Sequence, residues 1–167
     1  MKVLFVGINP GLYTAATGHH FARPGNRFWP ALHAAGFSRR LLHPSEQREL
    51  LEEGYGITNL VNRATATAAE VAPAEFVARR RRLAAKVRRY RPRIVAFLGV
   101  GAYCSAFSVK SATIGPQPGR FENAAVWVLP NPSGLNANYQ IGDLVKLFRR
   151  LRKATQENRW QRNSRKP

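Results

Sequence analysis

The segment that decides the fold is VLFVGINPG at residues 3–11, and a second segment, VWVLPNPSGLN at residues 126–136, repeats its pattern. Each segment starts with a run of apolar side chains and continues into an Asn-Pro pair beside a glycine. An uninterrupted apolar run bounded by turn residues predicts a strand buried on both faces, as strands of parallel sheets are. Parallel strands end at one edge of their sheet, where ligands bind, so we expect both turns to face one cleft.

The rest of the chain completes an α/β pattern. The sequence predicts strands at 2–7, 94–98 and 125–129, a strand or extended loop at 56–61, and helices at 26–35, 45–53, 73–90, 101–107 and 138–153. Residues 8–25 are expected to form a long loop, and the stretch between 107 and 125 a turn or hairpin. Strands that alternate with helices indicate a three-layer α/β/α fold with a short, mostly parallel central sheet.

The helix expected at 73–90 has an apolar and a basic stripe. The apolar stripe should face the core and consists of Phe76, Leu83, Val87 and Tyr90. The basic stripe is either a solvated face or a phosphate-binding face and consists of Arg79, Arg82, Lys86 and Arg89.

Composition narrows the class of protein. The 167 residues are 44% hydrophobic and carry a formal net charge of +18, which points to one globular domain with a polyanionic partner. We expect a single domain at 1–153 and a basic, flexible tail at 154–167. The lone Cys104 cannot form an internal disulfide, and no leader or membrane-spanning stretch is evident, so we expect a cytoplasmic protein.

The two Asn-Pro turns have two interpretations. Asn, Pro and Gly are common in ordinary strand-to-helix turns for local conformational reasons. Alternatively, proline holds the preceding asparagine out of the helical region and glycine admits a ligand close to the backbone, as a binding site requires. Two such turns at one sheet edge, in a strongly basic chain, favour the second interpretation.

Three motifs then match a family: GINPG at 7–11, GHHFARPGNRFW at 18–29 and NPSGLN at 131–136. Together they resemble the mismatch-specific uracil-DNA glycosylases, the bacterial branch related to thymine-DNA glycosylase. The resemblance implies that Asn9 activates a water molecule and that Phe21 stacks on a base flipped out of the duplex. It also implies that the turn Ser133-Gly134-Leu135 enters the duplex, with Leu135 as the wedge.

The same resemblance implies further site residues. Ile8, Gly11, Phe21 and Asn131 are expected to bind the base, partly through backbone groups; Asn62, His19 and His20 are secondary candidates. Some relatives carry an acidic residue where Asn62 stands, and an asparagine there can only hydrogen-bond. The alternative for Asn62 is a loop residue that bonds its own backbone. The histidines lack zinc-ligand spacing, so no metal site is expected.

The expected reaction is hydrolysis of the N-glycosidic bond of uracil, notably opposite guanine, or of a related damaged or mismatched pyrimidine in double-stranded DNA. Neither turn supplies a carboxylate, so catalysis must stabilise the leaving base and the cation-like sugar, which favours bases that leave readily. Neither turn supplies a Schiff-base lysine, so the product is an abasic site without strand cleavage. We expect a monomer without cofactors. The alternatives are a non-catalytic, basic nucleic-acid-binding protein and a different α/β hydrolase acting on nucleotides.

Overall fold

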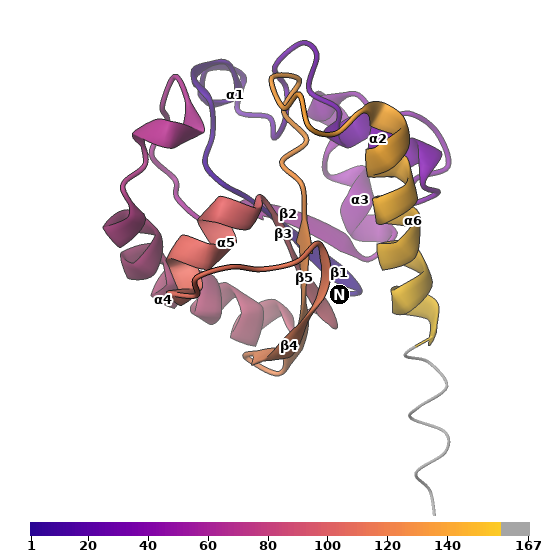
Figure 1. The fold of residues 1–167 in the computed structure, drawn as a ribbon. Helices are drawn as coiled ribbons and strands as arrows, with labels where there is room; N and C mark the ends of the chain where they lie inside the picture. Colours follow the sequence, from indigo (N-terminus) through magenta and orange to yellow (C-terminus); the bar gives the residue numbers. More distant parts are fainter. Residues whose placement is uncertain (158–167) are drawn as a thin grey trace, which may run out of the picture.

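The computed structural model describes residues 1–157, and its centre is a sheet of five strands (Figure 1). The strands are β1 (Val3–Gly7), β2 (Tyr55–Asn59), β3 (Ile94–Leu98), β4 (Gly115–Phe121) and β5 (Ala124–Leu129). Their order across the sheet is β2-β1-β3-β5-β4. The pairs β1–β2, β1–β3 and β3–β5 are parallel, and only β4 runs antiparallel, against β5. Four strands therefore end at the same edge of the sheet.

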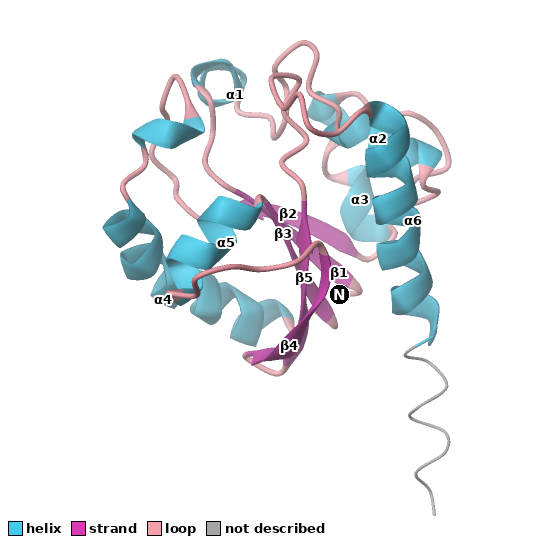
Figure 2. Cartoon of the chain, in the orientation of Figure 1, coloured by secondary structure: helices cyan, strands magenta, loops and turns pink. Residues whose placement is uncertain are grey.

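Helices cover both faces of this sheet (Figure 2). In chain order they are α1 (Leu12–Thr17), α2 (Phe28–Ala34), α3 (Glu49–Glu52), α4 (Pro73–Tyr90), α5 (Val100–Phe107) and α6 (Ile141–Glu157). Short 3-10 turns lie at Pro44–Glu46 and Ala68–Glu70. The helices α2, α3 and α6 cover one face, and α4 and α5 cover the other, so the expected three-layer α/β/α fold is confirmed.

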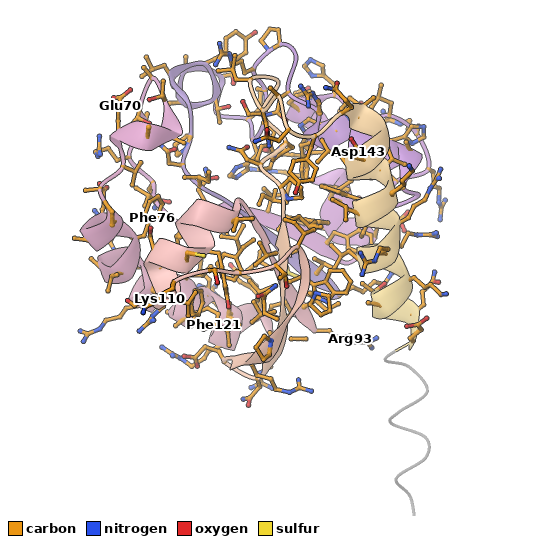
Figure 3. All side chains as sticks on the ribbon, in the orientation of Figure 1. Glu70, Phe76, Arg93, Lys110, Phe121 and Asp143 are labelled. Carbon is orange, nitrogen blue, oxygen red and sulfur yellow. The ribbon has the colours of Figure 1, made fainter. Side chains whose placement is uncertain are left out.

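Each face of the sheet has its own apolar cluster. On the α2 and α6 side, Phe5 of the sheet contacts the rings of Phe28 and Phe148, with centroids 5.5 and 6.0 Å apart. On the opposite side, Phe76 of α4 and Phe121 of β4, both labelled in Figure 3, pack with the second cluster. These clusters hold the strand ends in place, which fixes the geometry of the loops that leave them.

The buried strands were predicted closely, and the loop after β1 was not. The expected strand or extended loop at 56–61 is strand β2, shifted toward the N-terminus by one to two residues. Residues 8–25 contain the helix α1, which buries no residue and therefore lacks an apolar stripe in the sequence. The expected helix at 45–53 is divided into a 3-10 turn and the four-residue α3.

The stretch before β5 is the antiparallel edge strand β4, which completes a hairpin. Its prolines, Pro116 and Pro118, are tolerated because an edge strand leaves one row of amides unpaired. The helix expected at 26–35 is the shorter α2, and its N-cap is Arg27, not Asn26 as the sequence predicts. The Asn26 side-chain oxygen accepts from the Phe28 backbone N–H at 2.9 Å, in the turn that precedes the helix.

Three further expectations from the sequence are corrected in the helices α6 and α4. The last helix continues to Glu157 instead of ending near 153, because Leu151 and Thr155 still face the core. The remainder of the expected tail, 158–167, lies outside the described residues. Tyr90, expected in the core, is 48% exposed at the C-terminal end of α4. Lys86 is half-buried and donates to Thr58 Oγ1 at 2.7 Å, so it does not belong to the exposed basic face that the sequence predicts on α4.

No helix among residues 1–157 combines the length and the apolar character that crossing a membrane requires.

Candidate active site

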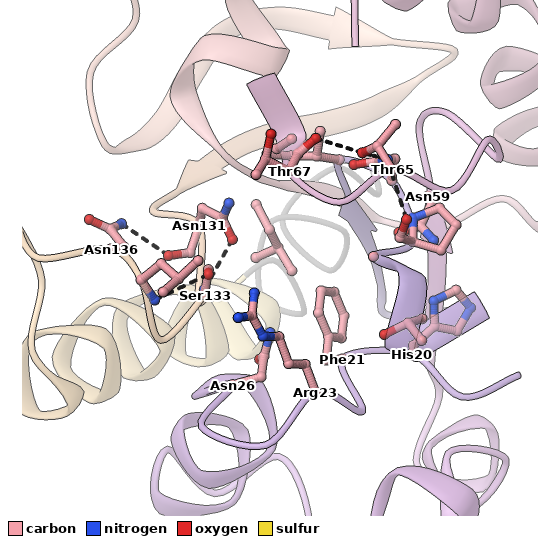
Figure 4. Close-up of a pocket in the computed structure, with 18 of the residues that line it drawn as sticks. His20, Phe21, Arg23, Asn26, Asn59, Thr65, Thr67, Asn131, Ser133 and Asn136 are labelled. Carbon is pink, nitrogen blue, oxygen red and sulfur yellow. Dashed lines mark hydrogen bonds between the residues drawn. The ribbon is translucent and has the colours of Figure 1, made fainter. Parts of the chain in front are cut away.

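A cavity of about 360 Å³ opens at the edge where the parallel strands end. Its wall contains residues that follow or end four strands: Ile8 and Asn9 after β1, Asn59 at the end of β2, Leu98 at the end of β3, and Asn131 after β5. The volume falls in the range of small-ligand sites. In Figure 4, Phe21 stands between Asn131 and Ser133 on one side and Asn59 and Thr65 on the other.

The side-chain amide of Asn9 has a defined orientation. Its Nδ2 donates to the Arg63 carbonyl at 2.9 Å and to Thr65 Oγ1 at 2.7 Å. The Arg63 carbonyl can only accept, so the NH₂ group must face it. Among the described residues no donor reaches Asn9 Oδ1. Because Asn9 lines the cavity, this oxygen is the part of the amide left to accept a hydrogen bond from water.

Thr65 is the second reason for this orientation, and sequence reasoning missed it. Its hydroxyl donates to the Thr67 carbonyl at 2.6 Å, so toward Asn9 it acts as an acceptor. Thr65 is buried, and its loop is tied to α4 by the ion pair of Arg63 with Glu75, at 3.1 Å. The guanidinium of Arg63 lowers the pKa of the Glu75 carboxyl, which keeps this tie charged. Bonds from Asn9 into a loop more than fifty residues away leave no local sequence signal.

Phe21 presents an aromatic face to the cavity from a strained backbone. Its φ of 55° lies in the left-handed region, which costs free energy for a side chain of this size. The ring stacks on Phe28 with centroids 4.2 Å apart and planes 28° apart. A Cβ at Gly7 would lie 2.5 Å from Asn59 Oδ1 and 3.1 Å from the Phe21 ring. Glycine at position 7 therefore permits both side chains to approach the end of β1.

His20 is held beside Phe21 as a neutral side chain. Burial, and secondarily the charge of Lys86, lower the pKa of its imidazole from the usual 6.5. The backbone is anchored on both sides, since His20 N–H donates to Gln47 Oε1 at 2.8 Å and Trp29 Nε1 donates to the His20 carbonyl at 3.0 Å. At neutral pH, His20 offers the cavity a hydrogen-bonding ring without a charge.

The second Asn-Pro turn supplies the opposite wall of the cavity. Asn131 Oδ1 accepts from Ser133 N–H at 3.1 Å, so its amide oxygen is committed to the turn and its Nδ2 remains. Leu135 of this turn is 69% exposed and also lines the cavity. Gly134 lies against Gly25 of the first loop, where a Cβ would be 2.5 Å from the Gly25 carbonyl oxygen.

The structure thus brings most of the candidates from the sequence to one cavity. Its lining includes Ile8, Asn9, Gly11, His20, Phe21, Asn131, Ser133 and Leu135, with Gly134 in the adjoining surface pocket. Asn62 is exposed and lies outside the cavity lining, because its neighbour Val61 takes the buried position. His19 is also outside, with a buried Nδ1 that has no partner among the described residues.

Asn59 was missed, although the rule that placed Asn9 could have found it. It ends β2 at the same sheet edge, so a polar residue there faces the same cleft. Within residues 1–157, no group of three His, Cys, Asp or Glu side chains is placed to hold a metal ion.

The fold and cavity together define an α/β protein with a small-ligand site at the carboxyl edge of its sheet. A model of the uracil DNA glycosylase superfamily matches residues 1–160, nearly the whole chain, and the protein belongs to that superfamily. Membership implies DNA N-glycosylase activity, the excision of uracil or a damaged base from a DNA substrate in base-excision repair.

Proposed function

We propose that this protein is a monofunctional glycosylase of the mismatch-specific type. It flips uracil, notably uracil opposite guanine, or a related damaged or mismatched pyrimidine out of double-stranded DNA. It then hydrolyses the N-glycosidic bond and leaves an abasic site. We expect it to act on DNA as a monomer.

The cavity suits a flat, polar ring. Phe21 offers an aromatic face braced by Phe28, and base–aromatic stacking is worth about 1–3 kcal/mol per base. The amides of Asn59 and Asn131 can pair with the edge of a pyrimidine, which carries both acceptor oxygens and an N–H donor. Both amides reach the lining from strand ends, so the rigid sheet positions them.

Asn9 positions the water molecule that attacks the sugar. Its free Oδ1 accepts a hydrogen bond from a water molecule and directs the water's oxygen toward C1′ of the flipped nucleotide. The new C1′–O bond forms while the C1′–N1 bond breaks, and the bonding electron pair leaves with the base. Asn9 has no useful basicity at neutral pH, so the water's proton passes to solvent or to the departed base.

This arrangement favours weakly paired bases. Among the described residues that line the cavity there is neither a carboxylic acid to protonate the departing base nor a lysine to form a Schiff base, and the lowered pKa of His20 keeps its imidazole neutral at neutral pH. The rate depends on how readily the base departs and how easily it leaves the stack. A uracil opposite guanine is mispaired and costs less to extrude than one opposite adenine.

Leu135 fills the space that the flipped nucleotide vacates. An exposed leucine on a rigid turn beside the cavity has the size and apolarity to lie between base steps. The single observation that carries the proposal is the pairing of an oriented Asn9 amide with the Phe21 platform in one cavity beside this leucine.

A cleavage assay on a panel of DNA substrates tests the proposal. Duplexes with G·U and A·U pairs and single-stranded uracil DNA are incubated with excess protein and then treated with alkali to break abasic sites. We expect G·U duplexes to be processed faster than A·U duplexes, with no strand break before alkali. The control is the Asn9→Ala variant.

The same assay, with free deoxyuridine monophosphate added to the panel, separates the alternatives. A non-catalytic binding protein shifts all the DNAs in a gel and cleaves none of them. A hydrolase of free nucleotides releases uracil from deoxyuridine monophosphate and leaves the DNAs intact. Equal rates on G·U and A·U duplexes would remove the mismatch-specific part of the proposal.

A further inference from the structure

The turn that carries Leu135 is held from outside by one arginine. Arg27 lies immediately before α2, and its guanidinium donates to three backbone carbonyls of the turn: Gly134 at 3.0 Å, Asn136 at 3.2 Å, and Tyr139. Its backbone N–H also donates to the Pro132 carbonyl at 2.9 Å. One residue thus satisfies four carbonyls across the segment from 132 to 139.

Among the described residues, only Arg27 and the adjoining Asn131 form hydrogen bonds with this segment from outside it. It belongs to no helix or strand, and its local bonds, such as Asn136 Nδ2 to the Asn131 carbonyl at 3.0 Å, only shape the turn. Gly134 also lies close to Gly25 of the first loop, where a Cβ would be 2.5 Å from the carbonyl oxygen, but no hydrogen bond joins these two described residues. The bonds from Arg27 are therefore the hydrogen bonds that join the turn to the start of α2.

Arginine is chemically suited to this role. Its planar group presents five N–H donors in a fixed geometry, whereas the lysine ammonium is a compact charge that cannot reach three separated carbonyls. Arg27 is half-buried, and no carboxylate pairs with it in the described part of the chain. Its charge is instead met by neutral carbonyls, and charge-assisted bonds of this kind are about twice as strong as neutral ones.

The backbone of Arg27 is held in place by the residue that follows it. Its neighbour Phe28 is fully buried and stacks on Phe21, the aromatic face of the cavity. The same short segment therefore fixes both the platform for the base and the turn that bears Leu135.

We propose that Arg27 is a positioning residue whose guanidinium holds the Leu135 turn rigid enough to enter a duplex. The proposal rests on the proposed function, because Leu135 needs a stack to enter. A loose turn yields when it is pressed between base pairs, so loss of Arg27 slows extrusion of the base. Single-stranded DNA has no such stack, so its processing does not depend on this support.

The test compares Arg27→Lys and Arg27→Met with wild type under single-turnover conditions at saturating protein. On the G·U duplex we expect the Met variant to lose about 10²-fold and the Lys variant to lose less, since small misplacements carry costs of that order. On single-stranded uracil DNA both should stay within about threefold of wild type. The matched control is Arg149→Met, which removes a guanidinium bond of 3.1 Å to the Ala34 carbonyl at the other end of α2.

Two further readouts exclude a merely structural effect. A 2-aminopurine beside the uracil brightens when the stack opens, and this signal should be weaker with either Arg27 variant. The double variant of Arg27→Lys with Leu135→Ala should lose no more than Leu135→Ala alone, because both changes act through one wedge.

The possible outcomes distinguish a failure of the role proposed for Arg27 from a failure of the proposed glycosylase function. Equal losses on duplex and single strand, or full activity of Arg27→Lys and Arg27→Met on the duplex, would overturn the role of Arg27. If the Met variant fails to fold, the Lys variant, which keeps the charge and most of the bulk, decides the question by the same comparison. A wild-type protein that releases uracil from no DNA refutes the proposed function itself.

Discussion

Asn9 and Thr65 are joined by a hydrogen bond of 2.7 Å in which the asparagine amide donates and the threonine hydroxyl accepts. The direction of this hydrogen bond is fixed because the Thr65 hydroxyl donates its only proton to the Thr67 carbonyl. A residue outside the sequence motifs thereby determines which end of the Asn9 amide faces the cavity. The first prediction follows from this bond.

Replacing Thr65 by valine should slow excision and leave DNA binding intact. Without the hydroxyl, the Asn9 amide loses its closest partner and keeps the Arg63 carbonyl, so Oδ1 is held toward water less firmly. We expect the single-turnover rate on G·U duplexes to fall about tenfold or more. Thr65→Ser keeps the hydroxyl and should restore most of the rate. Equal rates for Thr65→Val and Thr65→Ser would show that the bond does not orient the catalytic amide.

Gly7→Ala should weaken base binding, because it disturbs the Phe21 ring and the Asn59 side chain. The new Cβ would press on Asn59 Oδ1 and on the Phe21 ring, at 2.5 and 3.1 Å, and overpacking of this kind costs about 1–3 kcal/mol. We expect weaker binding of uracil DNA and a lower unfolding temperature, measured by titration and thermal melting. Gly101→Ala, at a position with no atom within 4 Å of the new Cβ, is the control and should change neither. A normal affinity in Gly7→Ala would mean that Phe21 and Asn59 do not bind the base.

Acidification should destabilise the fold through His20. Its folded-state pKa lies below 6.5, so between that lowered value and 6.5 the unfolded chain binds more protons than the folded one. Stability is therefore fully present above about pH 6.5 and falls as the pH drops toward the folded-state pKa. Urea midpoints at about pH 7.5 and about pH 5.5 should differ less in His20→Gln than in wild type. An unchanged difference would assign the acid sensitivity to other groups.

Leu135→Ala should slow excision from duplex DNA about tenfold or more, with a smaller effect on single strands, because a wedge acts only on a stack. Single-turnover rates on the two substrates measure the ratio directly. The control is Leu41→Ala, which removes another exposed leucine, 54% accessible, remote from the cavity lining. Equal losses on both substrates would make Leu135 a folding residue.

Local patterns in the sequence were sufficient to predict the parallel strands and to place the two Asn-Pro turns at one edge of the sheet. A run such as Ile94–Leu98 is apolar at every position because helices cover both faces, so its burial is visible in the sequence. Asn9 and Asn131 were found because each directly follows such a run. The helix α1 was missed since it buries none of its residues and so leaves no apolar periodicity.

The supporting residues could not be found in this way. Thr65 reaches Asn9 across 56 positions, and Arg27 reaches the Leu135 turn across more than a hundred. Neither bond requires a particular local pattern, so each appears only when the strands have brought the loops together. Asn62, a secondary candidate for which a loop residue was the alternative, is exposed and lies outside the cavity lining.

The most direct test of the account is the single-turnover rate of uracil release from a G·U duplex by wild type and Asn9→Ala, with DNA affinity measured in parallel. Removing a positioned catalytic group typically costs about 10² or more, so we predict a loss of that size at unchanged affinity. Asn62→Ala, a change outside the cavity, should match wild type. Wild-type rates in Asn9→Ala would contradict the claim that Asn9 holds the attacking water.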